Sequence, residues 1–307
     1  MTTLTTTIKK EHWAVITIVL TVFALAFGDA LIKGASGNLT LWQIFILRSI
    51  VVIPTLICII KLIDNAQSIW PKRLGWTLLR SNMLSLMWIA YYIALPHVNL
   101  SIAAASYYTL PLFITIFAAF FLNDTIRWAG WLAIVLGFIG VIFILEPRAE
   151  DFNWFAILPV FSAILYALSM ILTRSHCQTE NVFVLSLWLN ISMLAMGLIA
   201  SLFVYGMEPD AQLISRYEFL LGSWGAMDIN QWVAIGILAV AILTGSIGAA
   251  YAYQNAPPAI IATFDFTYVG FAVFWGFFLF SEIPSTNGML GILLIVVAGI
   301  LAVRKPK

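Results

Sequence analysis

Ten apolar stretches, separated by short polar connections, make up most of the chain. Each is about 20 residues long, which is the length an α-helix needs to cross the hydrocarbon core of a membrane. Apolar residues run through them continuously and do not alternate with polar ones, so the pattern predicts membrane-spanning helices and excludes a transmembrane barrel. The predicted spans lie near 12–33, 39–61, 74–95, 98–122, 128–145, 153–174, 181–204, 231–254, 257–281 and 287–303.

Composition agrees with this pattern. Of the 307 residues, 62% are hydrophobic and only 9% are charged, and the mean hydropathy is +1.00. A soluble domain of this length carries far more charge. We therefore expect an all-α integral membrane protein of ten transmembrane helices. The net charge of +1 argues against a nucleic-acid partner.

The distribution of basic residues predicts the orientation. If the helices alternate in direction, one side of the membrane holds most of the lysines and arginines of the connections, and by the positive-inside rule this side is the cytoplasm. Both termini are then cytoplasmic, in a multi-pass protein of the cell (inner) membrane. Cys58 and Cys177 fall toward the same side, which disfavours a disulfide. The residues on this side are Lys9, Lys10, Lys61, Lys72, Arg73, Arg80, Arg127, Arg174, Arg304, Lys305 and Lys307, against Lys33, Arg148 and Arg216 on the other.

The chain also contains a copy of its own pattern. A shift of about 158 residues aligns Thr109 with Thr267, Asp124 with Glu282 and Gly130 with Gly288. Five helices per copy is an odd number, so the two copies must have opposite orientations in the membrane. We expect two inverted five-helix repeats, 1–147 and 148–307, which is the architecture from which alternating access arises.

Several strings carry a family resemblance. "GDALIKG" in the first helix, "WQIFILRS" in the second, "AAASYYTLPLF" in the fourth and "FDFTYVGFAVFWGFFLFSEIP" in the ninth resemble the drug/metabolite transporter superfamily, and within it the EamA-type permeases. The resemblance implies a ten-helix carrier of small organic solutes with a central cavity and with helices five and ten at the periphery. Asp124 departs from the pattern, because the family more often has a Glu there.

An acidic residue interrupts the ninth helix. Asp265 lies on one helical face with Tyr268 and Trp275, and small residues complete that face. Ionisable residues inside membranes face the bundle interior or a wet cavity, and Arg48, at a similar depth in the second helix, is the expected partner. The pair either joins two helices statically or contacts the substrate, and we favour the second interpretation because buried pairs are weak evidence for stability.

Asp29 and Lys33 are neighbours on one face of the first helix, at i and i+4. They form either a local pair near the outer interface or an outer polar gate of the cavity. Pro111 and the Pro257–Pro258 pair predict backbone irregularity in related places of helices four and nine, as either a binding segment or a packed kink. Gly137, Gly140, Gly288 and Gly291 are expected to let helices five and ten pack closely.

Aromatic residues make up 14% of the chain. Those at helix ends are typical of the interfacial belt. About half of the deeper ones are expected to provide flat cavity walls suited to rings or cations. The predicted substrate-binding residues are Asp265, Arg48, Tyr268, Trp275, Tyr108, Tyr107, Trp88, Tyr92, Asp29 and Lys33.

The sequence carries no phosphate-binding loop, metal-ligand cluster or nucleophile elbow, so we predict no cofactor, metal or enzymatic activity. The favoured function is a secondary active or facilitative transporter of a small polar metabolite, first an amino acid or related zwitterion, then a small carboxylate or an organic cation. Outside this class stand a membrane-embedded enzyme or a scaffold. The expected partners are the substrate, the lipid bilayer and protons as a candidate coupling ion, for a monomer or homodimer.

Overall fold

The computed structural model describes residues 2–63, 65, 67–122, 128–145 and 153–303. Asp124, Arg127, Arg148, Arg304, Lys305 and Lys307 lie outside these ranges. The described part is helical and contains no strand. Its elements are α1 (Thr2–Ala35), α2 (Leu41–Ile63), α3 (Leu74–Ala94), α4 (Leu100–Tyr107), α5 (Leu110–Leu122), α6 (Trp128–Leu145), η1 (Trp154–Ile157), α7 (Leu158–Ser175), α8 (Val182–Met207), α9 (Ala211–Arg216), α10 (Glu218–Leu221), α11 (Ile229–Asn255), α12 (Pro258–Asp265), α13 (Thr267–Phe280) and α14 (Thr286–Val303).

Seven helical segments of the described residues are long and apolar enough to cross a membrane. The predicted spans 74–95, 128–145 and 287–303 are also helical, as α3, α6 and α14, but they are not among the seven. The protein is therefore a multi-pass membrane protein of helices, as the hydrophobic pattern predicts. The seven segments are His12–Ala35, Leu41–Ile63, Leu100–Phe121, Trp154–Ser175, Val182–Met207, Ile229–Asn255 and Ile260–Phe280.

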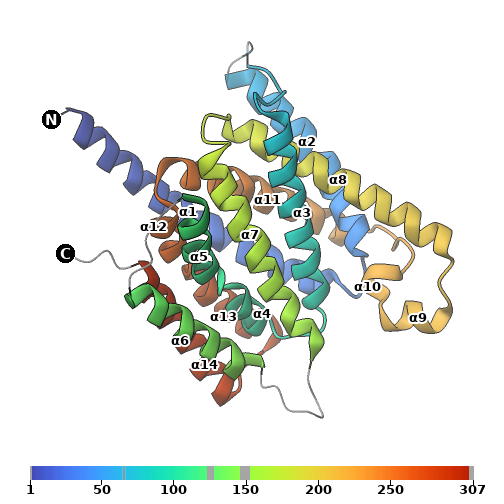
Figure 1. The fold of residues 1–307 in the computed structure, drawn as a ribbon. Coiled ribbons are helices and arrows are strands. Elements are labelled where there is room, and N and C mark those ends of the chain that lie inside the picture. The colour runs from blue at the N-terminus through green and yellow to red at the C-terminus, as the bar shows by residue number, and fades with distance from the viewer. Residues whose placement is uncertain (1, 64, 66, 123–127, 146–152, 304–307) are drawn as a thin grey trace.

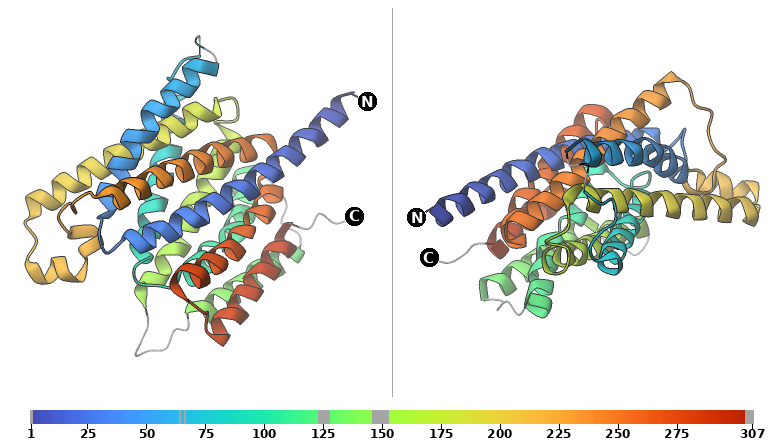
Figure 2. Two further views of the ribbon diagram at one scale, coloured as in Figure 1. Left: turned by 180° about the vertical axis from the view of Figure 1, so that it is seen from behind. Right: turned by 90° about the horizontal axis from the view of Figure 1, so that it is seen from above.

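The helices pack mainly in long pairs. The helix α1 lies along α11, α2 along α8, and α3 along α7, and Figure 2 shows α1 and α11 side by side from behind. The pair α6 and α14 contacts the rest of the bundle chiefly through α4, α5 and α12 and lies at its edge in Figure 1. This is the peripheral position that the family resemblance implies for helices five and ten.

The connection after α8 folds back onto α2. It contains the short helices α9 and α10. The indole of Trp42 donates to the carbonyl of Leu220 over 2.9 Å. Gln43 donates to the carbonyl of Gly225 and accepts from its amide. These bonds hold the connection against the beginning of α2.

Two helices are interrupted in the middle of the bundle. Residues Tyr108 and Thr109 separate α4 from α5, and Phe266 separates α12 from α13. At each break a threonine hydroxyl donates to the carbonyl three residues earlier, from Thr109 over 2.9 Å and from Thr267 over 2.8 Å. Local bonds of this kind satisfy backbone groups that the helix leaves free.

The prolines do not mark these breaks equivalently. Pro111 is the second residue of α5, just after the first break, whereas Pro257 and Pro258 open α12, a full helix before the second. The predicted backbone irregularity in related places of the two helices is therefore confirmed, but the prolines do not mark both breaks. A proline at the start of a helix is tolerated, because the first amides have no intrahelical partner, so the second break forms without one.

Close packing of α6 on α14 depends on Gly140. A Cβ atom there would lie 2.9 Å from the carbonyl oxygen of Gly291 and 2.8 Å from Cγ1 of Ile295. The prediction of close packing is confirmed for Gly140. It is wrong for Gly288, whose added Cβ would meet only Ser285 and Pro284 of the preceding turn.

We predict that Gly140→Ala destabilises the protein by about 1–3 kcal/mol, because the added methyl group overpacks a backbone contact. Gly236→Ala is the matched control in α11, where no atom lies within 4 Å of the added Cβ. Helix propensity alone makes that change stabilising by up to about 1 kcal/mol. Thermal unfolding in detergent measures both, and equal behaviour of the two variants would contradict the α6–α14 contact.

Candidate functional site

A small cavity lies between the two interrupted helices. Its volume is about 20 Å³, which holds little more than one water molecule. Residues from α1, α3, α4, α7, α12 and α13 contribute to its wall. They are Val22, Leu25, Asp29, Trp88, Tyr91, Tyr107, Tyr108, Tyr166, Asp265 and Tyr268. Of the ten predicted substrate-binding residues, the structure brings Asp29, Trp88, Tyr107, Tyr108, Asp265 and Tyr268 together here.

Asp265 is 2% exposed and ends α12 directly before the break. Each of its carboxylate oxygens accepts a tyrosine hydroxyl, from Tyr108 over 2.9 Å and from Tyr253 over 3.0 Å. Tyr108 belongs to the other break and Tyr253 to α11. A buried carboxylate is tolerated when donors replace the lost water, so these two hydroxyls explain how an acid is accommodated in this helix.

Asp29 lies across the cavity on α1 and is 1% exposed. The hydroxyl of Tyr268 donates a short hydrogen bond to its Oδ2, and the hydroxyl of Tyr91 lies 2.9 Å from that of Tyr268. Because Tyr268 donates to Asp29, Tyr91 is the donor to Tyr268. Oδ1 of Asp29 accepts no hydrogen bond of normal geometry, although Tyr92 lies nearby.

Arg48 does not pair with Asp265. Its guanidinium donates to the sulfur of Met193 over 3.2 Å, stacks 5.2 Å from the ring centre of Phe45, and interacts electrostatically with Asp29 and Tyr92. The predicted Arg48–Asp265 pair is therefore wrong, because tyrosines occupy both oxygens of Asp265. Arg48 is buried behind the cavity on the Asp29 side.

Aromatic rings form a continuous wall. Tyr107 lies 5.4 Å from Tyr91 and 5.8 Å from Tyr166 between ring centres, and Tyr108 stacks on Tyr268 at 5.2 Å. The predicted residue Tyr92 lies one layer out, stacked on Trp88 at 5.0 Å. Trp275 packs on Phe27 at 4.7 Å and is not part of the cavity lining.

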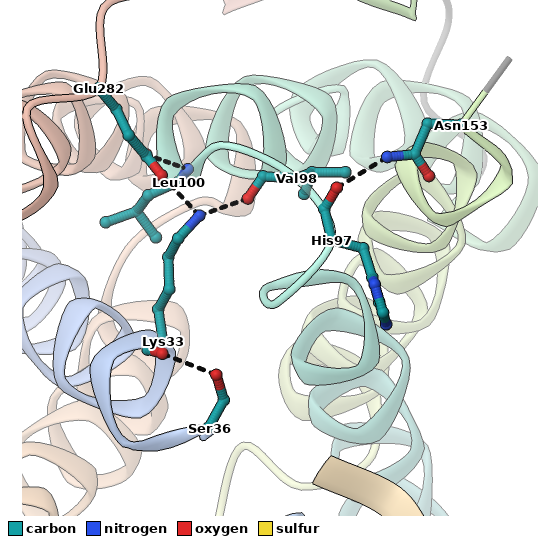
Figure 3. Close-up of polar contacts among 7 residues, drawn as sticks. All are labelled: Lys33, Ser36, His97, Val98, Leu100, Asn153 and Glu282. Atoms are coloured by element: carbon teal, nitrogen blue, oxygen red, sulfur yellow. Dashed lines mark hydrogen bonds and ion pairs between the residues drawn. The ribbon is translucent and has the colours of Figure 1, made fainter. Parts of the chain in front are cut away.

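Lys33 lies at the end of the bundle where α1 and α13 end and α4 begins (Figure 3). Its ammonium pairs with Glu282 at 2.7 Å and donates to the carbonyl of Val98 over 2.5 Å. The other oxygen of Glu282 accepts the amide of Leu100 over 2.7 Å, at the first residue of α4. The expected local pair of Lys33 with Asp29 is therefore replaced by a contact that joins three elements. We call these four residues the Lys33 latch.

Arg80 does not lie in a cytoplasmic connection, although its charge predicted this. It lies within α3 and is 1% exposed. Its Nε donates to the hydroxyl of Thr173 over 2.6 Å, whereas Nη1 has no partner. Arg80 lines a second cavity of about 30 Å³, and Leu25, Trp88 and Tyr166 line both cavities.

Tyr253 was also missed, although α11 carries two tyrosines, Tyr251 and Tyr253. Gly245 and Ala249 lie at i−8 and i−4 from Tyr253, on the face of α11 that lines the second cavity. This small-residue face is the signal that separates Tyr253 from Tyr251. Arg80 lies six residues inside an apolar stretch, and this position indicates that it is buried within a helix and not in a connection.

Comparisons with known proteins agree with this architecture. Residues 12–146 match the EamA-like transporter family. A riboflavin transporter of Vibrio cholerae is 27% identical over 252 residues, 81% of this chain and 76% of the relative. A pseudopaline exporter of Pseudomonas aeruginosa is 26% identical over 297 residues, 95% of this chain and 96% of the relative.

Two further similarities concern the sequence and the fold. An S-adenosylmethionine uptake transporter of Rickettsia bellii is 26% identical over 200 residues, 65% of this chain and 62% of the relative. A crystal structure of 17% sequence identity has a TM-score of 0.61 and covers 94% of both chains, which supports the fold. The EamA-like match over residues 12–146 and these relatives support the assignment of the chain to the drug/metabolite transporter superfamily.

Proposed function

We propose that the protein is a secondary carrier of a small polar organic metabolite, which it moves by alternating access through the central cavity. The observation that carries the proposal is the pair of buried carboxylates, Asp29 and Asp265, in an aromatic cavity between two interrupted helices. Ionisable groups at this depth are costly and mark substrate or ion pathways. The named substrates of the relatives, riboflavin, S-adenosylmethionine and pseudopaline, are all small organic molecules.

The proposal includes ten membrane crossings in two inverted repeats, with both termini in the cytoplasm of a cell whose inner membrane holds the protein. Helix bounds support it, because α4 at 100–107 becomes 258–265, the bounds of α12, when 158 is added. The same shift turns α6 at 128–145 into 286–303, the bounds of α14. It also aligns the threonines of the two breaks, Thr109 and Thr267.

Packing supports the repeat independently. If α1, α2 and α3 correspond to α7, α8 and α11, then the contact of α1 with α11 becomes that of α7 with α3. The contact of α3 with α8 becomes that of α11 with α2, and both members of each pair occur. Two bundles related in this way about a midplane site can exchange conformations, which is the basis of alternating access.

The cavity favours a substrate with a positive group and a flat or apolar body. Its lining contains two carboxylates, five tyrosines and a tryptophan, and aromatic faces attract cations. An amino acid or related zwitterion remains the first choice, an organic cation the second. A simple carboxylate fits less well, since this cavity has no Lys or Arg in its lining. The chemistry of the site offers binding and no reaction, which favours a carrier over an enzyme.

The Lys33 latch supports a gate at one end of this pathway. Glu282 holds α13 to the first amide of α4, and Lys33 ties α1 to both. With the first helix starting in the cytoplasm, this end is the outer one. Opening it requires that the ion pair separates, so the latch replaces the Asp29–Lys33 gate considered from the sequence.

We predict that Asp265→Asn folds and transports at least about tenfold more slowly. Asparagine keeps the shape and one acceptor for the two tyrosines, but it removes the charge that attracts the substrate, and charge-assisted bonds are roughly twice as strong as neutral ones. Uptake into proteoliposomes measures the effect. Asp210→Asn is the control, because Asp210 caps α9 by accepting the amide of Leu213 and asparagine caps equally well.

Transport by Asp265→Asn at the rate of the parent protein would contradict the binding role. The same uptake assay, run with and without an imposed pH gradient, tests whether protons are the coupling ion. Indifference to the gradient would remove proton coupling and leave the binding role intact.

We predict that Glu282→Gln or Lys33→Met opens the outer end. A cysteine in place of Ser101, which is 1% exposed and next to the latch, should react about tenfold faster with a membrane-impermeant maleimide, because losing about 1.4 kcal/mol of pairing shifts the opening equilibrium tenfold. Cys58 and Cys177 are replaced by Ser in this background.

Lys72→Met is the matched control for the latch, since the Lys72 ammonium donates to the carbonyl of Thr179 at the opposite end of the bundle. It should leave the reaction of the Ser101→Cys cysteine unchanged. Equal labelling rates in the latch variants and the parent would refute the gate.

A further inference from the structure

We propose that Arg80 is the anion-binding residue of the transport site, and that the substrate is an extended zwitterion whose negative end meets Arg80 and whose positive end meets Asp29 and Asp265. This deepens the proposed function by assigning a substrate class and a residue to the second cavity. The transport step of this inference rests on the proposed function, whereas the binding of the substrate by Arg80 is tested separately.

The burial of Arg80 needs a counter-charge. The side chain is 1% exposed, its one polar contact is the hydroxyl of Thr173, and Nη1 has no partner. No carboxylate of the described residues forms an ion pair with it. A buried, uncompensated charge is strongly destabilising, and an anionic substrate group that reaches the cavity supplies what the protein leaves out.

The second cavity places Arg80 on the same pathway as the carboxylates. Trp88 and Tyr166 line both cavities, so the cavity that Arg80 lines adjoins the one that Asp29 and Asp265 line. One face of α3 runs along both, because Arg80, Leu84, Trp88 and Tyr91 follow a spacing of i, i+4, i+8 and i+11. Rotation of the shared rings joins the two cavities into one site with opposite charges at its ends.

The geometry selects among zwitterions. Arg80 and Trp88 are eight residues apart on one helix, or about 12 Å along its axis. A molecule that carries its two charges at opposite ends of a ring or chain can contact an anion site and a cation site that are separated along the helix, whereas a simple α-amino acid carries both charges at one end. The shared aromatic walls favour a ring between the charges.

The test uses matched probes on purified full-length protein. One set is 4-(aminomethyl)benzoate with benzylamine and 4-methylbenzoate, which each lack one charge, and a second is 6-aminohexanoate with hexylamine and hexanoate. Ligands of the native state raise the unfolding temperature by mass action. We expect at least one extended zwitterion to bind about tenfold or more tightly than either of its singly charged counterparts.

Three variants assign the ends. Arg80→Gln should abolish the preference for the zwitterion over its amine, Arg80→Lys should restore part of it, and Asp29→Asn should abolish the preference over the acid. Arg216→Gln is the matched control, since Arg216 is exposed in α9 and should leave both preferences intact. Arg80→Gln should not lower the unfolding temperature without ligand, because it removes an unpaired buried charge.

Three results would overturn the inference. They are an amine that binds as tightly as its zwitterion, a preference that survives Arg80→Gln, and a panel in which no zwitterion stabilises the protein. We then measure whether proteoliposomes take up the compound that binds, because this tests the carrier function separately from the role of Arg80. Uptake of amines alone would support the carrier function and contradict the anion-binding role of Arg80. Arg80-dependent binding without uptake would support the role of Arg80 and contradict the carrier function.

Discussion

Burial of a carboxylate inside an apolar helix bundle is the constraint on which the centre of this molecule depends. Asp265 is 2% exposed, so each of its carboxylate oxygens needs a donor that the fold holds in place. The donors are Tyr108 and Tyr253, which come from the other interrupted helix and from α11. One acid therefore fixes three elements relative to each other, and both helix breaks lie beside the residues that satisfy it.

Two buried arginines have fewer polar partners than Asp265 has. Arg48 finds a ring and a sulfur, and Arg80 finds one hydroxyl, but neither forms an ion pair with a carboxylate among the described residues. The protein thus keeps Arg80 without an ion pair in the part of the chain that the structure describes, with Asp29 and Asp265 at one cavity and Arg80 at the next. Charges kept apart in this way cost stability and remain free for a ligand. The Lys33 latch closes one end of the same space, and the cavities of about 20 and 30 Å³ are correspondingly narrow.

Hydrophobic length predicted the helices well, because a membrane span needs about 20 apolar residues whatever it packs against. The 158-residue shift likewise predicted equivalent segments, and α4 and α12 have bounds that fit it. Pairing was harder to predict. Asp265 with Arg48 and Asp29 with Lys33 are reasonable from charge and depth, yet hydroxyls of Tyr108 and Tyr268 reach the acids instead. Which side chain reaches a buried acid depends on helix rotation and on breaks that hydropathy does not register.

The most direct measurement is access to the cavity from each side of the membrane. Ala249 lines the second cavity and is 7% exposed, so an Ala249→Cys variant without Cys58 and Cys177 places a small reporter on the pathway. Alternating access predicts that a membrane-impermeant thiol reagent labels this cysteine from either face of oriented vesicles, and that a bound substrate slows both reactions. Labelling from one face alone under every condition, or from neither, would contradict a transport pathway through these residues.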